Sequence, residues 1–67
     1  MRIRVGPFFA DILHDSKSTL RAYHYIIQRD GSNQILLWNQ ESTEEAAKKA
    51  AEAELRRFQD EHDKAAS

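Results

Sequence analysis

The stretch from Arg21 to Asn39 most constrains how this chain can fold, because strand-forming residues lie on both sides of a turn signal. Residues 21–29 and 32–39 are rich in aromatic and β-branched side chains, which suit a pleated, half-buried surface. Between them, Asp30-Gly31 provides the positive φ that a tight turn between twisted strands requires. The stretch therefore predicts a β-hairpin.

The register of this hairpin decides which side chains share a face of the sheet. A two-residue turn at Asp30-Gly31 pairs Ile26 with Ile35. A four-residue loop keeps the same partition, whereas a three-residue loop with a glycine bulge exchanges the sides of one strand. We adopt the first partition. One face then contains Tyr23, Tyr25, Ile27, Leu36 and Trp38, and the other contains Ala22, His24, Ile26, Ile35 and Leu37.

The residues before the hairpin predict one further strand at Phe8–His14, followed by a polar loop at residues 15–19. Residues 3–5 form either a continuation of that strand across a kink or a short arm. We therefore treat residues 1–7 as a possible arm or kinked edge extension of the domain. Pro7 has no N–H to give to a ladder and belongs at a sheet edge. The sequence predicts a three-stranded antiparallel sheet with strand order 1-2-3.

After Trp38 the pattern changes to that of a helix. Ser42-Thr-Glu-Glu45 fits a capping box, in which the Ser42 hydroxyl accepts from the N–H of Glu45. Residues from Thr43 to about His62 contain no Gly or Pro and many alanines, and residues 63–67 are expected to fray. The predicted fold is α+β, a βββα unit with one C-terminal helix on the sheet. The apolar stripe of the helix is Ala47, Ala50, Ala51, Leu55 and Phe58.

The uncovered face of the predicted sheet is the main functional signal. Small alanines let the helix come close to the sheet, so we expect the helix to cover the larger face with Tyr23, Tyr25, Leu36 and Trp38. Soluble monomers rarely leave a contiguous apolar patch bare. The other face is therefore either covered by the N-terminal arm or binds a partner, most simply in a homodimer. Its predicted interaction residues are His24, Ile26, Ile35 and Leu37.

Length, charge and composition limit the other possibilities. The 67 residues allow one domain, near the size at which a core barely offsets chain entropy. Cysteine is absent, so disulfides and thiolate zinc sites are excluded. No apolar run approaches the roughly 20 residues of a membrane span, and a cytoplasmic location is the default expectation. The net charge is −1, which argues against a strongly basic nucleic-acid domain.

The residue types that catalyse reactions or bind metals lie in unsuitable patterns. His14, His24 and His62 are far apart and show no metal-ligand spacing, so we expect surface or structural histidines and no metal. Ser16-Lys17-Ser18-Thr19 lacks the glycines of a phosphate-binding loop. A single helix on a sheet encloses no deep cleft. We therefore expect a non-enzymatic protein with no cofactor and no small-molecule substrate.

A second hypothesis is a nucleic-acid-binding sheet. Exposed aromatic side chains can stack on bases, and arginines can reach phosphates or guanine. This reading requires the aromatic face to be the exposed one, so the position of Trp38 and Tyr25 relative to Leu55 and Phe58 separates the two hypotheses. The candidate nucleic-acid contacts are Arg2, Arg4, Arg21, Arg29, Tyr23 and Tyr25.

The segment Ile35-Leu-Leu-Trp-Asn-Gln-Glu-Ser-Thr-Glu-Glu-Ala-Ala47 is a last strand that runs into a capped helix. It resembles the end of the AP2 domain and of integrase arm-binding domains, in which a three-stranded sheet with one C-terminal helix reads DNA. It is also similar to small bacterial proteins of unassigned function that contain a hairpin-helix unit. The resemblance implies the βββα fold. The Arg/Trp pattern of the DNA-reading strands is missing, so no DNA-reading residue carries over.

Overall fold

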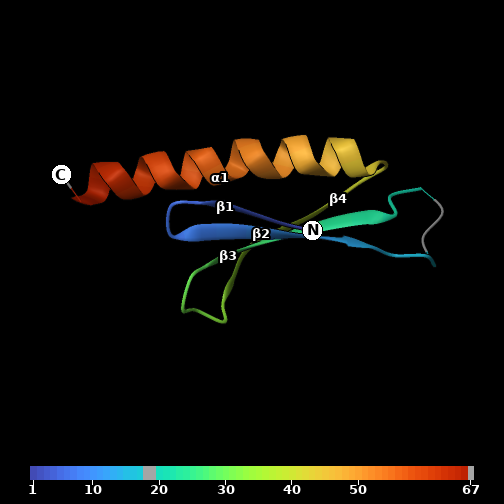
Figure 1. Ribbon diagram of the computed structural model, residues 1–67, viewed down its shortest axis with the longest axis horizontal. Helices are drawn as coiled ribbons and strands as arrows, with labels where there is room; N and C mark the ends of the chain where they lie inside the picture. Colours follow the sequence, from blue (N-terminus) through green and yellow to red (C-terminus); the bar gives the residue numbers. More distant parts are fainter. Residues whose placement is uncertain (18–19, 67) are drawn as a thin grey trace.

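A computed structural model, which describes residues 1–17 and 20–66, shows a twisted antiparallel sheet with one long helix along one side (Figure 1). The sheet has four strands in the order β1-β2-β3-β4. The α+β class, the antiparallel sheet and the C-terminal helix are confirmed, whereas the predicted count of three strands is wrong. The elements are β1 (Arg2–Val5), β2 (Phe8–His14), β3 (Tyr23–Arg29), β4 (Ile35–Glu41) and α1 (Glu44–Ala66).

The additional strand is β1, which the sequence analysis assigned to an arm or a kinked extension. Gly6 has a φ of +59°, a value that L side chains avoid, and with Pro7 it turns the chain back on itself. Arg2 then pairs with Asp11 and Val5 with Phe8. Residues 2–5 therefore form the edge strand of the sheet and do not fold over its face. Pro7 lies in the turn, where its missing N–H breaks no ladder bond.

The register of the β3–β4 hairpin also differs from the prediction. Next to the loop, Gln28 pairs with Ile35, but one step further Ile27 pairs with Leu37, so Leu36 is the extra residue of a β-bulge. Because side chains alternate along a strand, this one residue exchanges the sides of everything after it. Leu37 lies on the helix side, and Trp38, paired with Ile26, lies on the opposite side. The predicted placement of these two residues is wrong.

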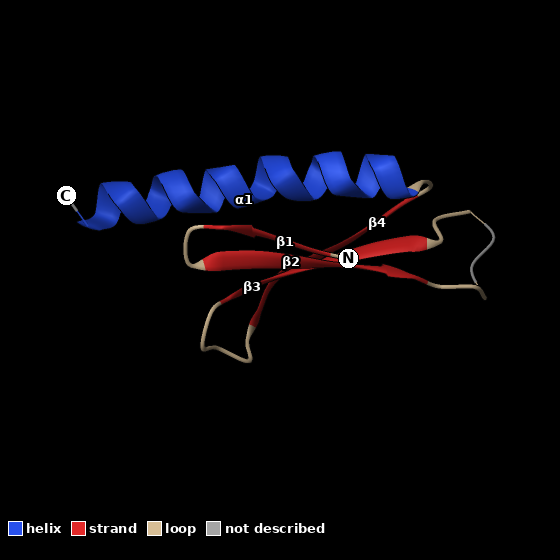
Figure 2. Ribbon diagram, viewed as in Figure 1, coloured by secondary structure: helices blue, strands red, loops and turns tan. Residues whose placement is uncertain are grey.

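The helix begins one residue later than predicted and continues further. The hydroxyl of Thr43, not that of Ser42, accepts the N–H of Ala46 at 3.1 Å, so Thr43 is the N-cap and no capping box forms. The glutamates of the first turn still complement the helix dipole. The helix continues to Ala66, four residues past the predicted end near His62. In Figure 2 its C-terminal turns extend beyond the strands.

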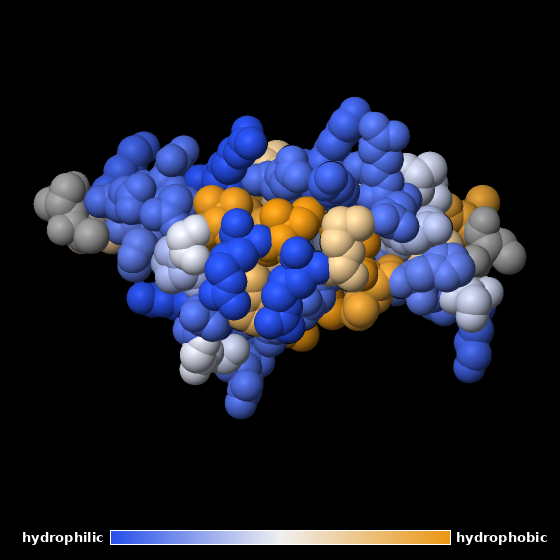
Figure 3. Space-filling view, in the orientation of Figure 1, coloured by the Kyte–Doolittle hydropathy of each residue, from blue (hydrophilic) through white to orange (hydrophobic). Residues whose placement is uncertain are grey.

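The core lies between the helix and one face of the sheet. The predicted helix stripe is confirmed, since Ala47, Ala51 and Leu55 are fully buried and Ala50 and Phe58 pack against them. Figure 3 shows apolar side chains in the middle of the molecule, beneath the hydrophilic outer surface of the helix. Only small side chains let the helix approach the sheet along its first half. The sheet contributes Phe8, Ala10, Ile12, Tyr25 and Ile27 to this core.

Candidate interaction surface

The side of the sheet away from α1, called the open face below, is the candidate site. Its members follow from the strand register, because cross-strand partners point to the same side. Trp38 pairs with Ile26, Ile26 with Asp11, and Asp11 with Arg2 across all four strands. The open face contains Arg2, Arg4, Phe9, Asp11, Leu13, His24, Ile26, Gln28, Ile35, Trp38 and Gln40.

Three large apolar side chains on the open face are more than half exposed. Leu13 is 51% exposed, Ile35 54% and Trp38 55%. Ile26 lies between them in the register and is half-buried. Burying an exposed side chain of this size on a partner is favourable by about 1.5–3 kcal/mol. Because several such side chains share one side of the sheet, the open face can dock an apolar surface.

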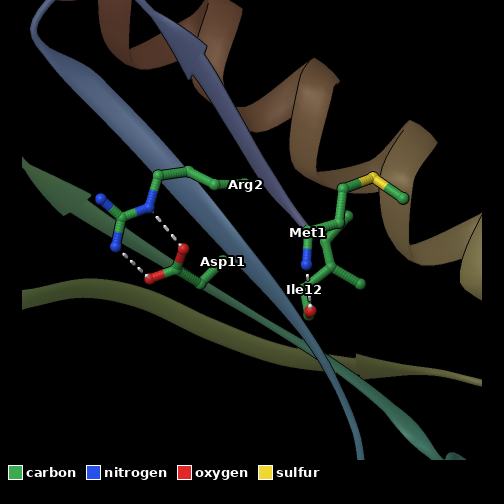
Figure 4. A network of polar contacts seen from close by, with 4 residues as sticks. All are labelled: Met1, Arg2, Asp11 and Ile12. Atoms are coloured by element: carbon green, nitrogen blue, oxygen red, sulfur yellow. Dashed lines mark hydrogen bonds and ion pairs between the residues drawn. The ribbon is translucent and has the colours of Figure 1, made fainter.

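One end of the open face is covered by the two arginines of β1. The Arg2 guanidinium lies 4.3 Å from the centre of the Phe9 ring, and the Arg4 guanidinium lies 5.6 Å from it. Phe9 is therefore buried without help from the helix. The Arg2 Nε donates to Asp11 Oδ1 at 2.7 Å and Nη2 donates to Oδ2 at 3.1 Å (Figure 4). This hydrogen bonding to Asp11 raises the pKa of Arg2.

The first residue extends the same pairing. Met1 and Ile12 exchange two backbone hydrogen bonds: Ile12 N donates to Met1 O at 2.8 Å, and Met1 N donates to Ile12 O at 3.3 Å (Figure 4). Such a reciprocal pair is the hydrogen-bonded pair of an antiparallel ladder. The β1 edge is therefore tied to β2 along its whole length.

At the other end of the open face, Trp38 is held in place by a histidine. The indole Nε1 donates to His24 Nδ1 at 3.2 Å, and the two rings lie 5.6 Å apart. In this arrangement His24 Nδ1 is the acceptor, so the neutral imidazole has its proton on Nε2. That nitrogen lies 3.7 Å from Asp15 Oδ2. His24 therefore orients the exposed indole, while its own Nε2 makes no hydrogen bond within the described residues.

The four predicted interaction residues do not all lie together. His24, Ile26 and Ile35 are on the open face, but Leu37 packs against the core on the helix side. Sequence reasoning placed Trp38 on the covered face, because the bulge at Leu36 has no signature in the residues. Leu13 was not named, although its position alternates with the buried Ile12 and could have been found from that pattern.

The six candidate nucleic-acid contacts are divided between the two sides of the sheet. Arg2 and Arg4 lie on the open face, where Arg2 pairs with Asp11 and Arg4 Nη1 lies 3.1 Å from Asp30 Oδ2. Tyr25 is only 3% exposed, in the core. Tyr23 is half-buried, with its ring 4.7 Å from that of His14. Arg21 and Arg29 are exposed.

Tyr25 and Trp38, whose positions were expected to separate the two hypotheses, lie on opposite sides of the sheet. Tyr25 contacts the helix side and is covered, so its ring is not available to stack on a base. Trp38 lies on the open face and is exposed. The prediction that Tyr25 is exposed and contacts nucleic acid is therefore wrong.

Other candidate chemistry is also dispersed. His62 packs against the Phe8 ring at 5.8 Å, far along the chain from His14 and His24. Among residues 1–17 and 20–66 no group of three or more His, Cys, Asp or Glu side chains is placed to hold a metal ion, and no cavity is found. Ser18 and Thr19 of the polar loop lie outside the described residues. No helix in the described part is long and apolar enough to cross a membrane.

No protein-family model, curated protein or solved structure matches this chain. The resemblance of residues 35–47 to AP2 and integrase arm-binding domains therefore stays a prediction.

Proposed function

We propose that this chain is a small non-enzymatic interaction module that binds a protein, or a second copy of itself, through the open face. The observation that supports the proposal is the group formed by Leu13, Ile35 and Trp38, which are exposed on the side of the sheet that the helix leaves uncovered. Exposed aromatic and aliphatic side chains of this size are the usual anchors of protein interfaces.

The polar residues around these anchors fit the same role. His24 orients Trp38, so part of the conformational cost of docking the indole is met before binding. Arg2, Arg4 and Asp11 form a polar border beside Phe9. An apolar centre with a polar rim is the typical anatomy of an interface.

The test compares two variants that add the same charge at different places. Leu13→Lys puts a cation on the open face, whereas Ala53→Lys puts one on the exposed outer side of the helix. Binding of a protein partner to the open face is measured by affinity capture from an extract of the source cells. We expect Leu13→Lys to abolish the association and Ala53→Lys to leave it intact. Equal behaviour of the two variants would remove the open face from consideration.

A nucleic-acid-binding role is the second candidate, and one observation favours it. Trp38 is exposed on the same face as Arg2 and Arg4, so an indole and two cations are together on one surface. Against it, Asp11 and Asp30 neutralise both arginines. We favour the protein partner because the open face has almost no excess positive charge.

A titration separates the two candidates. Fluorescent duplex and single-stranded oligonucleotides are mixed with the chain at low salt, where phosphate contacts are strongest. The protein-binding proposal predicts no complex at about 50 μM protein. A complex that dissociates as salt is raised, and that Trp38→Ala weakens, would replace it with the nucleic-acid role.

A further inference from the structure

The backbone of β4 directs N–H and C=O groups outward, at the edge of the sheet that no other described strand pairs with. Successive residues of a strand direct their N–H and C=O groups to opposite sides. Asp30 donates to the Pro7 carbonyl at 2.7 Å, so the even-numbered residues of β3 face β2, and Tyr25 and Ile27 face β4. The partners of His24 and Ile26, which are Gln40 and Trp38, therefore direct their groups away from β3.

A second observation agrees with this direction. The N–H of Gln40 donates to the side-chain Oδ1 of Asn39 at 2.8 Å. Because β4 is the last strand in the sheet order, the N–H and C=O of Trp38 face a side on which the described residues form no further strand. They are available to a strand from outside.

The position of Trp38 makes β4 suited to pairing with itself. Trp38 is the middle residue of the seven in Ile35–Glu41. A two-fold axis through Trp38 pairs the two Trp38 residues directly and places the bulge at Leu36 of one copy opposite Gln40 of the other. Since Trp38 directs its backbone groups outward, the two copies can exchange both N–H···O=C bonds there. The register keeps both helices on one side and joins the two open faces.

Charge favours a second copy as the occupant of this edge. Residues 35–40 contain no charged side chain, and in the two-fold register Glu41 of one copy is opposite Ile35 of the other. No like charges therefore meet. The chain has a net charge of only −1, so long-range repulsion between copies is small. β4 lacks the lysine and proline that often protect natural edge strands from pairing, and its bulge at Leu36, another such protection, lies outside the regular segment 37–41.

From these observations we infer that two copies of this chain pair antiparallel through β4, with Trp38 on the two-fold axis, to form one continuous sheet. The inference goes beyond the proposed function, because the contact is made by the backbone edge of β4 and leaves the open face accessible to a partner. The joined sheet has one helix layer, and the two indoles lie next to each other on the joined open face. Apolar surface of both copies then forms a single area at the centre of the dimer.

The test uses the full chain and a pair of variants at one position. Gln40→Pro removes the outward N–H, with its hydrogen bond to Asn39 Oδ1, and places a ring at the edge without touching the ladder between β3 and β4. Gln40→Ala loses the same side chain but keeps the N–H. Sedimentation equilibrium from about 10 μM to 1 mM measures self-association. We expect Gln40→Pro to weaken it at least about tenfold and Gln40→Ala to change it by less than about threefold.

Amide exchange of the wild-type chain gives a second measurement that does not depend on how a variant folds. The Trp38 amide is expected to exchange freely in dilute solution and to become protected as concentration rises, whereas the Asn39 amide is protected throughout. A monomer at every concentration would overturn the pairing but leave a heterologous partner of the open face possible. Self-association that Leu13→Lys breaks and Gln40→Pro leaves intact would also overturn it, in favour of packing between open faces.

Discussion

The two edges of the sheet differ in ways that the strands themselves explain. The β1 edge is short, contains Arg2 and Arg4, and is packed on the helix side through Ile3 and Val5. Charged residues and short length are the usual protections of an edge against pairing. The β4 edge is longer and uncharged up to Gln40, and Ile35, Leu36 and Trp38 are exposed. The same chain therefore closes one edge and leaves the other open to a partner.

The largest expected effect is the difference in lost stability between a substitution in the core beneath the helix and one on the surface of β4. Leu55→Ala removes a fully buried side chain of the helix that covers the core, and we expect it to lower the free energy of unfolding by about 2–5 kcal/mol. Leu36→Ala, at the exposed bulge of β4, should cost no more than about 0.5 kcal/mol in the monomer. Urea unfolding followed by circular dichroism measures both. Similar losses would show that β4 contributes to the core as much as the helix does.

The two glycine turns provide the next comparison, one at each edge. Gly6 and Gly31 have φ values of +59° and +81°, so an alanine at either position is strained by about 1–2 kcal/mol. At Gly6 a Cβ would also lie 1.6 Å from Gln59 Oε1 of the helix, whereas at Gly31 it would meet nothing within 4 Å. Gly6→Ala should therefore be the more destabilising substitution in thermal unfolding.

The difference between these two turns has its own control. Because the Gln59 amide is the end of a flexible side chain, it can move away, and the additional cost at Gly6 should be less than about 1 kcal/mol. In a Gln59→Ala background the two glycine variants should lose similar stability. A difference that persists there would place its origin in the β1–β2 turn itself rather than in the contact with the helix.

Tyr25 lies in the core and its backbone pairs with β4. Ionisation of its phenol should make the stability of the fold depend on pH in the alkaline range. Burial raises the pKa of Tyr25 above its usual value of 10.0, while the hydrogen bond with Asn39 on β4 opposes the shift. The folded state therefore keeps the phenol proton more strongly than the unfolded state. The stability contribution of the neutral ring is complete below pH 10 and is lost as pH rises through the folded pKa.

Tyr25→Phe tests this linkage. Because the substitution removes only the hydroxyl of a buried ring, we expect it to change stability by no more than about 1 kcal/mol at neutral pH. Above pH 10 the variant should lose stability less steeply than the wild type, because it has no phenol to ionise at this position. Urea midpoints measured from pH 7 to pH 11 give both quantities, and Tyr23→Phe is the control for a ring that is less buried. Parallel pH profiles of wild type and Tyr25→Phe would contradict the assignment.

The helix and its buried stripe could be predicted because their pattern does not depend on any partner. Ala47, Ala51 and Leu55 recur with the period of a helix, and all three are buried. The existence of the hairpin could be predicted for a similar reason, since Asp30-Gly31 lies between strand formers. In both cases the signal is local and repeated several times.

The register and the first strand depend on single residues, and there the predictions were wrong. One extra residue at Leu36 moves Trp38 from the covered to the open face, and no residue type marks such a bulge. Gly6-Pro7 was interpreted as an interruption, although a glycine with positive φ can also reverse the chain. Ser42 and Thr43 are equivalent N-caps in chemistry, and where β4 ends decides between them. Trp38 was therefore missed as a site residue.

The smallest expected effect concerns the protection of the β1 edge. Arg2 makes two separable interactions: an exposed ion pair with Asp11, and contact with the Phe9 ring. Arg2→Met removes the charge but keeps an apolar stem over Phe9, whereas Arg2→Ala removes both. We expect the stability loss to be the smallest of this series for Arg2→Met and somewhat larger for Arg2→Ala.

Salt distinguishes the two interactions of Arg2. At about 1 M salt an exposed ion pair is largely screened, so the difference between wild type and Arg2→Met should vanish. The difference between Arg2→Met and Arg2→Ala comes from the cover of Phe9 and should persist. Unfolding midpoints at low and high salt measure both. The double variant Arg2→Ala/Gln40→Pro tests whether Arg2 also protects β1 from pairing. Because Gln40→Pro blocks the β4 edge, self-association of this double variant would have to use β1. Such self-association would show that Arg2 protects the β1 edge as well as covering Phe9.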